Sequence, residues 1–301
     1  MTQAAPPINA RDVPSVRPAR AHSRLTWLGV VPFFVFAAAF LALPVVFLVV
    51  GSFQDSSSHF TLQNYANLTT QDIPNAYETS IEISAVTAIG GGILGFLLAY
   101  SVILGGLPGF LRTGLMTFSG VASNFAGVPL ALAFVFTLGH AGLVTVLLSS
   151  WFGINIYSGG FNLYTKLGLE IVYLYFQFPL MVLIVAPALD GLKREWREAS
   201  ENLGATSAQY WRHVALPILT PTLLGTMILL FGNAFGAQAT AYQLTGGTIN
   251  LVTLVISSEM RGDVLNDPGL GYALAMGMVV IMAIAIGLYS LLQRRSDRWF
   301  R

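Results

Sequence analysis

The sequence contains few residue groups that could carry out catalysis. Cysteine is absent, which excludes disulfides, thiolate nucleophiles and cysteine-ligated metals. The run Gly90–Gly95 (GGGILG) formally matches the dinucleotide-binding pattern G-x-G-x-x-G, but it lies inside an apolar stretch with no strand before it. His140 stands alone, without the G-x-S-x-G or H-E-x-x-H motif of a serine hydrolase or a metalloprotease. We therefore predict no catalytic residue and no metal site.

A polar segment at residues 197–221, REASENLGATSAQYWRHVALPILTP, is the longest one between the first and last apolar stretches. Small residues near its start would let a partner surface approach closely. Gly204 can adopt a positive φ and join two short helices. Tyr210 and Trp211 are large side chains of the kind that dominate protein interfaces. The segment therefore predicts a docking surface for another protein.

The spacing within this segment is similar to a known family pattern. Glu198-Ala199-Ser200, three residues, Gly204, nine residues and then Val214-Ala215-Leu216-Pro217 resembles the EAA loop of permease subunits of binding-protein-dependent ABC importers. Serine for the second alanine and valine for isoleucine are the departures from that pattern. The resemblance implies that the segment docks a separate ATPase through Glu198, Ala199, Ser200, Gly204, Tyr210, Trp211, Leu216 and Pro217.

The composition indicates an all-α, polytopic membrane protein. Hydrophobic residues make up 54% of the 301-residue chain and charged residues 10%, whereas soluble domains carry about 25% charged residues. Six apolar stretches are long enough to cross a bilayer, namely 27–51, 77–104, 113–138, 167–189, 217–239 and 269–292. The apolar piece Leu143–Phe152 is too short to cross and is predicted to be interfacial or re-entrant. Residues 240–268 are predicted to form a long outer loop.

The domain boundaries and the orientation follow from composition and charge. Residues 1–26 are rich in proline and arginine, which predicts a disordered cytoplasmic tail. A six-span permease domain is expected at 27–293, with its coupling loop at 190–217, and a basic cytoplasmic tail at 294–301. Of the 15 Lys and Arg residues, 13 lie in the two tails, the 105–112 turn and the coupling loop. The positive-inside rule therefore predicts cytoplasmic termini, and the resemblance implies a bacterial inner membrane.

Polar residues inside the predicted spans are candidates for a translocation path, because intramembrane polar groups are often functional. The candidates are Asn124, Gln177, Asn233 and Gln238. The alternative for each one is a hydrogen bond between helices. Gly91 and Gly95 form a G-x-x-x-G face that predicts close helix packing, either within the chain or between subunits.

The resemblance implies a type I ABC importer in which this chain is one membrane subunit. The complete importer would also contain a second permease, expected to be a different chain, and two copies of an ATPase. A periplasmic or lipid-anchored binding protein would deliver the substrate, and membrane lipid would surround the permeases. No G-x-x-x-x-G-K-[ST] phosphate loop occurs, so ATP and Mg would bind the partner ATPase, and this chain is predicted to be neither an enzyme nor a cofactor carrier. No nucleic-acid partner is predicted, because the basic residues are not clustered on a folded face.

The substrate prediction depends on two shorter stretches. Phe235–Gly246 (FGAQATAYQLTG) and Gly262–Gly271 (GDVLNDPGLG) resemble permeases grouped with spermidine/putrescine importers, which implies a polyamine substrate. Relatives in that group for iron(III), phosphonate and thiamine are alternatives. Two other classes stay open: an ion-coupled secondary transporter, although no inverted repeat is visible, and an intramembrane enzyme that uses His140.

Overall fold

The computed structural model describes residues 30–55, 57–70, 72–261 and 267–297. The predicted disordered tail at 1–26 lies outside these residues, as do 298–301 of the predicted basic tail. The chain divides into two compact units, residues 1–47 and 48–301. We describe each unit by itself.

The first unit contains the start of an apolar helix. It consists of α1 (Val31–Ala37), a π-helical segment η2 (Ala38–Ala42) and the beginning of α2 (Leu43–Ser52). The run Val31–Ser52 is 22 residues long, enough to cross a bilayer. Its large apolar side chains up to Phe47 are exposed in the chain, as expected for a helix that faces lipid. The predicted first span is confirmed from Val31 onward.

The second unit is built of helices along its described length. Its elements are α3 (Gln63–Asn67), α4 (Ile73–Ile103), α5 (Gly109–Ala122), α6 (Gly127–Leu138), α7 (Leu143–Phe152), α8 (Lys166–Asp190), α9 (Arg194–Asn202), α10 (Ser207–Tyr210), the π-helical segment η3 (Trp211–Ala215), α11 (Leu216–Phe235), α12 (Gln238–Thr245), α13 (Val252–Arg261) and α14 (Pro268–Asp297). With the first unit, six helical stretches are long and apolar enough to cross a membrane. The all-α, six-span prediction is confirmed.

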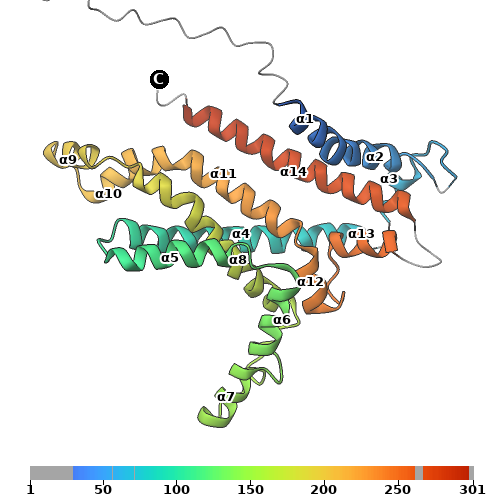
Figure 1. Ribbon diagram of the computed structural model, residues 1–301, viewed down its shortest axis with the longest axis horizontal. Helices are drawn as coiled ribbons and strands as arrows, with labels where there is room; N and C mark the ends of the chain where they lie inside the picture. Colours follow the sequence, from blue (N-terminus) through green and yellow to red (C-terminus); the bar gives the residue numbers. More distant parts are fainter. Residues whose placement is uncertain (1–29, 56, 71, 262–266, 298–301) are drawn as a thin grey trace, which may run out of the picture. The chain divides into compact units, whose positions relative to one another are not determined.

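The helices α4, α8 and α11 pack together at the centre of the second unit (Figure 1). Gly91 and Gly95 of α4 face α8, and a Cβ on Gly95 would lie 2.5 Å from the backbone oxygen of Phe178 and 2.6 Å from Met181 Cβ. Only glycine permits this approach of two backbones. The G-x-x-x-G face is therefore used within the chain.

The third predicted span, 113–138, is wrong as a single helix. Helix α5 ends at Ala122, and α6 begins at Gly127, whose φ is +73°. The backbone N–H of Gly127 donates to Thr240 Oγ1 at 2.8 Å, so a contact from a distant part of the sequence stabilises the break. In Figure 1, α6 and α7 lead away from α4, α5 and α11, and Gly127–Phe152 is the stretch long enough to span.

The outer loop predicted at 240–268 is also wrong in part, because it contains two helices. Helix α11 ends at Phe235, and α12 and α13 follow it. Leu244, Leu251 and Val252 in this region are buried. The low overall hydrophobicity of residues 240–268 gave no indication of these two helices in the sequence, because only one side of each short helix packs against the helices of the spans.

We predict that a methyl group at Gly95 destabilises the chain whereas one at Gly114 does not. Both glycines lie inside helices, but no heavy atom lies within 4 Å of a Cβ at Gly114. Gly95→Ala should lower the free energy of unfolding by about 1–3 kcal/mol through overpacking. Gly114→Ala should leave it unchanged or raise it, since alanine favours helices. Thermal unfolding of the purified variants in detergent measures the difference, and equal midpoints would contradict the packing argument.

Candidate functional site

The predicted coupling loop, residues 190–217, contains a hydrogen-bonded turn between α9 and α10. Helix α9 ends in a Schellman motif, in which Ala205 N–H donates to Ser200 O at 3.0 Å and Gly204 N–H to Glu201 O at 2.9 Å. Gly204 has φ +79°, a left-handed conformation in which a Cβ is costly. The glycine of the motif is therefore required by the backbone that ends α9.

The chain after Gly204 re-enters a helix through a capping box. Gln209 N–H donates to Thr206 Oγ1 at 3.3 Å, and Thr206 N–H donates to Gln209 Oε1 at 2.7 Å. These reciprocal bonds satisfy donors that the start of a helix leaves free. From Ser207 the helix continues through η3 into α11 up to Phe235. The coupling loop is thus continuous with a membrane span.

Charged side chains on α9 form two ion pairs within the loop. Arg194 Nε lies 2.8 Å from Glu198 Oε1, and Arg197 Nε lies 3.0 Å from Glu201 Oε1. Both pairs join successive turns and are exposed, so each is worth only about 0.3–0.5 kcal/mol. Glu198 is therefore oriented by Arg194 but is accessible, with 56% of its side chain exposed.

Tyr210 and Trp211 pack against the chain's own helices. Tyr210 is only 7% exposed. The Trp211 ring packs edge-to-face on Tyr100 at the end of α4, with 5.1 Å between ring centroids. The two rings therefore hold the coupling loop on the helices of this chain. The sequence pattern did not distinguish this role from contact with a partner.

The most exposed apolar side chain of the loop is one that the sequence reasoning missed. Leu203 is 88% exposed and precedes Gly204 at the tip of the turn. Trp196 on α9 and Leu216 at the start of α11 are 37% and 40% exposed. Ala199 is exposed as well, whereas Ser200 and Pro217 are half-buried. An isolated leucine in a polar turn is the signal that would have identified Leu203.

An ion pair joins two other helices close to the base of the loop. Arg112 in the first turns of α5 binds the carboxylate of Asp190, the last residue of α8. Asp190 lies four residues before α9 begins. The pair therefore connects α5 to the point where the chain enters the coupling loop.

Three of the four path candidates are at least partly exposed in the single chain. Asn124 lies in the break between α5 and α6, with Nδ2 donating to Gly120 O at 3.0 Å. Asn233 is exposed on α11, and Gln238 begins α12 and is partly buried. Gln177 is 0% exposed, and its Nε2 donates to Leu230 O of α11 at 2.9 Å. In this conformation Gln177 joins two helices and faces no open volume.

Comparison with known proteins identifies the family. A model of the family described as binding-protein-dependent transport system inner membrane component matches residues 91–298. The chain belongs to this family, and it is a multi-pass inner membrane permease subunit of an ABC importer. Its fold is also that of a crystallised bacterial ABC transporter involved in the import of the polysaccharide alginate, with a TM-score of 0.70 at 17% identity, covering 90% of this chain and 95% of that one.

Relatives of the chain carry two different substrate names. The sulfate transport system permease protein CysT of Salmonella typhimurium is 29% identical over 88% of this chain and 91% of its own length. The spermidine/putrescine transport system permease protein PotB of Haemophilus influenzae is 27% identical over 85% of this chain and 88% of its own length. The resemblance to ABC importer permeases is therefore confirmed, and the polyamine prediction is not.

We predict that Gly204→Val loosens the coupling loop and that Gly204→Asn does so less. No heavy atom lies within 4 Å of a Cβ at this position, so the effect comes from the backbone, at about 1–2 kcal/mol for a residue that avoids positive φ. Asparagine tolerates the left-handed region better. Trypsin cleavage at the arginines of the loop should be fastest in the valine variant. Equal cleavage of both variants and the wild type would contradict a strained turn.

Proposed function

We propose that the chain forms one half of the translocation path of a type I importer and receives an ATPase on its coupling loop. The observation that carries the proposal is the preformed turn, which exposes Leu203 at its tip and leaves the carboxylate of Glu198 accessible on the preceding helix α9. Many protein interfaces have an apolar centre surrounded by a polar, solvent-accessible rim. One ATPase would bind this loop and a second copy the loop of another permease chain. A binding protein would deliver the substrate from outside.

The helix that leaves the loop supports a mechanical role. Because α10, η3 and α11 form one continuous helical stretch from Ser207 to Phe235, a displacement of the loop would move α11. Gln177 of α8 is hydrogen-bonded to Leu230 of α11, so α8 would follow. ATP-driven closure of two ATPases would in this way change the separation of the spans, as rigid helices do in other switching proteins.

The outer part of the path would begin where Asn124, Asn233 and Gln238 are accessible. The break after Asn124 is held against α12 by the bond from Gly127 to Thr240. Gln238 is two residues from Thr240 on α12. The region of Asn124 therefore lies next to the region of Gln238, although the two are more than 100 residues apart in the sequence. A path lined by both would require this proximity.

For the substrate we propose a small oxyanion of the sulfate type, with a polyamine as the second candidate. The relative named for sulfate covers slightly more of this chain than the relative named for spermidine and putrescine, at similar identity. The two substrates carry opposite charges. Uptake of labelled sulfate and labelled spermidine by cells with and without the gene decides between them. We expect only sulfate uptake to fall and to return on complementation, and a selective loss of spermidine uptake would reverse the assignment.

We predict that Leu203→Glu separates the permease from its ATPase without unfolding it. Leu203 makes little contact with its own chain, so the variant should reach the membrane at the normal level. Loss of an exposed interface anchor should weaken ATPase binding by about tenfold or more. Vanadate-sensitive ATPase activity that co-purifies with the tagged chain from native membranes measures this. Leu203→Met, which keeps an apolar side chain, is the matched control, and full activity in Leu203→Glu would refute the docking surface.

A further inference from the structure

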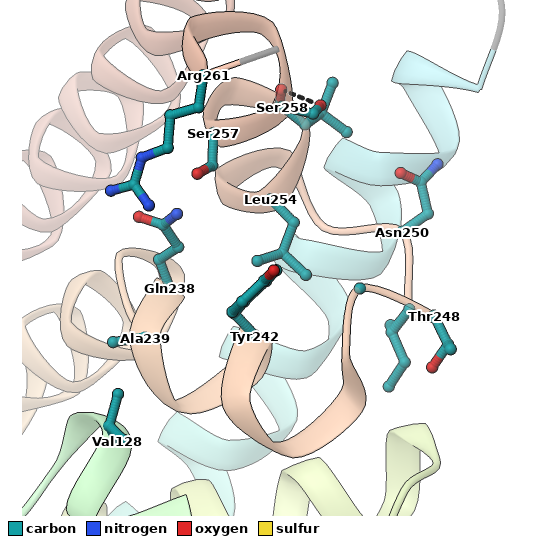
Figure 2. Close-up of a pocket in the computed structure, with 13 residues that line it drawn as sticks. Val128, Gln238, Ala239, Tyr242, Thr248, Asn250, Leu254, Ser257, Ser258 and Arg261 are labelled. Carbon is teal, nitrogen blue, oxygen red and sulfur yellow. Dashed lines mark hydrogen bonds between the residues drawn. The ribbon is translucent and has the colours of Figure 1, made fainter. Parts of the chain in front are cut away.

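A cavity of about 740 Å³ lies between α12, the turn that follows it, and α13. Its lining is mixed, and Figure 2 shows the polar part, which includes Gln238, Thr248, Asn250, Ser257, Ser258 and Arg261 beside apolar residues such as Leu254. Val128, in the first turn of α6, lies at one side of it. The cavity therefore adjoins the break in the third predicted span and includes one of the path candidates, Gln238.

The walls of the cavity are fixed to the central helices. Thr240 of α12 accepts the N–H of Gly127 at 2.8 Å, and Tyr173 of α8 donates to the backbone oxygen of Ala237 just before α12. At the start of α13, the N–H of Val252 donates to Ser80 Oγ of α4 at 2.9 Å. The two helices are thus held by hydrogen bonds to α4, α6 and α8. A site on such walls is preorganised.

The turn between α12 and α13 shapes the remaining wall. Gly246 and Gly247 have φ values of +59° and +85°, and no heavy atom lies within 4 Å of a Cβ at either position. These glycines let the chain reverse over two residues. The Nδ2 of Asn250 donates to Asp72 O at 2.8 Å, so this amide group already makes a structural hydrogen bond.

The donors that face the cavity are suited to an anion. The Arg261 guanidinium extends across the cavity toward the Gln238 side chain in Figure 2. Ser257 precedes Arg261 by four residues on α13, so both lie on one face of the helix. A planar guanidinium with neighbouring amide and hydroxyl donors is the arrangement that binds oxyanions in other proteins.

The charge of the lining also favours an anion. Arg261 is the one charged side chain among the described residues that line the cavity. The carboxylate of Glu259, two residues earlier on α13, is not part of the lining and accepts the N–H of Asp267 at 3.1 Å. A polyamine would meet a like charge here, whereas a divalent anion would meet an opposite one.

We infer that this cavity is an oxyanion subsite at the outer entrance of the path, in which Arg261, Gln238 and Ser257 bind a small tetrahedral dianion such as sulfate. The inference rests on the proposed importer function and adds the residues that receive the anion in this subunit.

Titration of the full-length purified chain with sodium sulfate tests the site. Ionic strength is held constant with sodium chloride, and the midpoint of thermal unfolding is followed. We expect a saturable rise in the wild type, at least about tenfold higher half-saturation in Arg261→Gln, and a smaller change in Arg261→Lys, which keeps the charge but not the planar fork. Lys166→Gln is the matched control, because Lys166 is paired with Glu82 and should not affect sulfate binding.

Two milder variants keep the test valid if Arg261→Gln does not fold. Ser257→Ala and Gln238→Leu should each weaken sulfate binding by several-fold. Equal half-saturation in the wild type and in every site variant that folds would overturn the subsite, as would a saturable rise with spermidine in place of sulfate.

Uptake by cells separates failure of the site from failure of the proposed function. If gene deletion abolishes sulfate uptake but Arg261→Gln restores it with an unchanged KM, the subsite is wrong and the importer function stands. If deletion leaves sulfate uptake intact while the purified chain binds sulfate through Arg261, the substrate proposal is wrong and the anion site stands. A raised KM for sulfate in Arg261→Gln supports both.

Discussion

The close packing of α4 on α8 is the constraint on which the other elements depend. Glycines 91 and 95 let the two backbones meet, and this brings Gln177 within reach of α11, where it donates to Leu230 O. In a membrane the hydrophobic effect does not drive helices together, so close backbone contact and hydrogen bonds between helices must supply the stability. The three central helices are held by these two kinds of contact.

Different segments of the chain pack against the two ends of these central helices. At one end, Tyr210 and Trp211 pack the predicted coupling loop against the chain's own helices, with Trp211 in contact with Tyr100 near the end of α4. At the other end, α12 and α13 are hydrogen-bonded to α4, α6 and α8. In the proposed importer, this arrangement would transmit a displacement of the predicted coupling loop to the helices that line the cavity.

Charge distinguishes the two substrate classes named among the relatives. The fold does not, because the same packed helices can surround either a cation or an anion. The side chains that line the cavity between α12 and α13 carry a positive charge, because the described lining residues include one arginine and no carboxylate. In the proposed importer, discrimination between sulfate and spermidine would depend on a few polar residues mounted on a common scaffold.

The sequence by itself determined the number of spans and the family, and it predicted the position of the coupling loop. These features depend on local properties: the length of apolar runs, the spacing from Glu198 to Pro217 and the conformational freedom of Gly204. Only the tertiary structure decided that the third span breaks at Gly127, that Gln177 joins α8 to α11, and that Arg261 faces Gln238 across a cavity. Each of these features depends on contacts between residues far apart in the chain, for which a local pattern carries no signal.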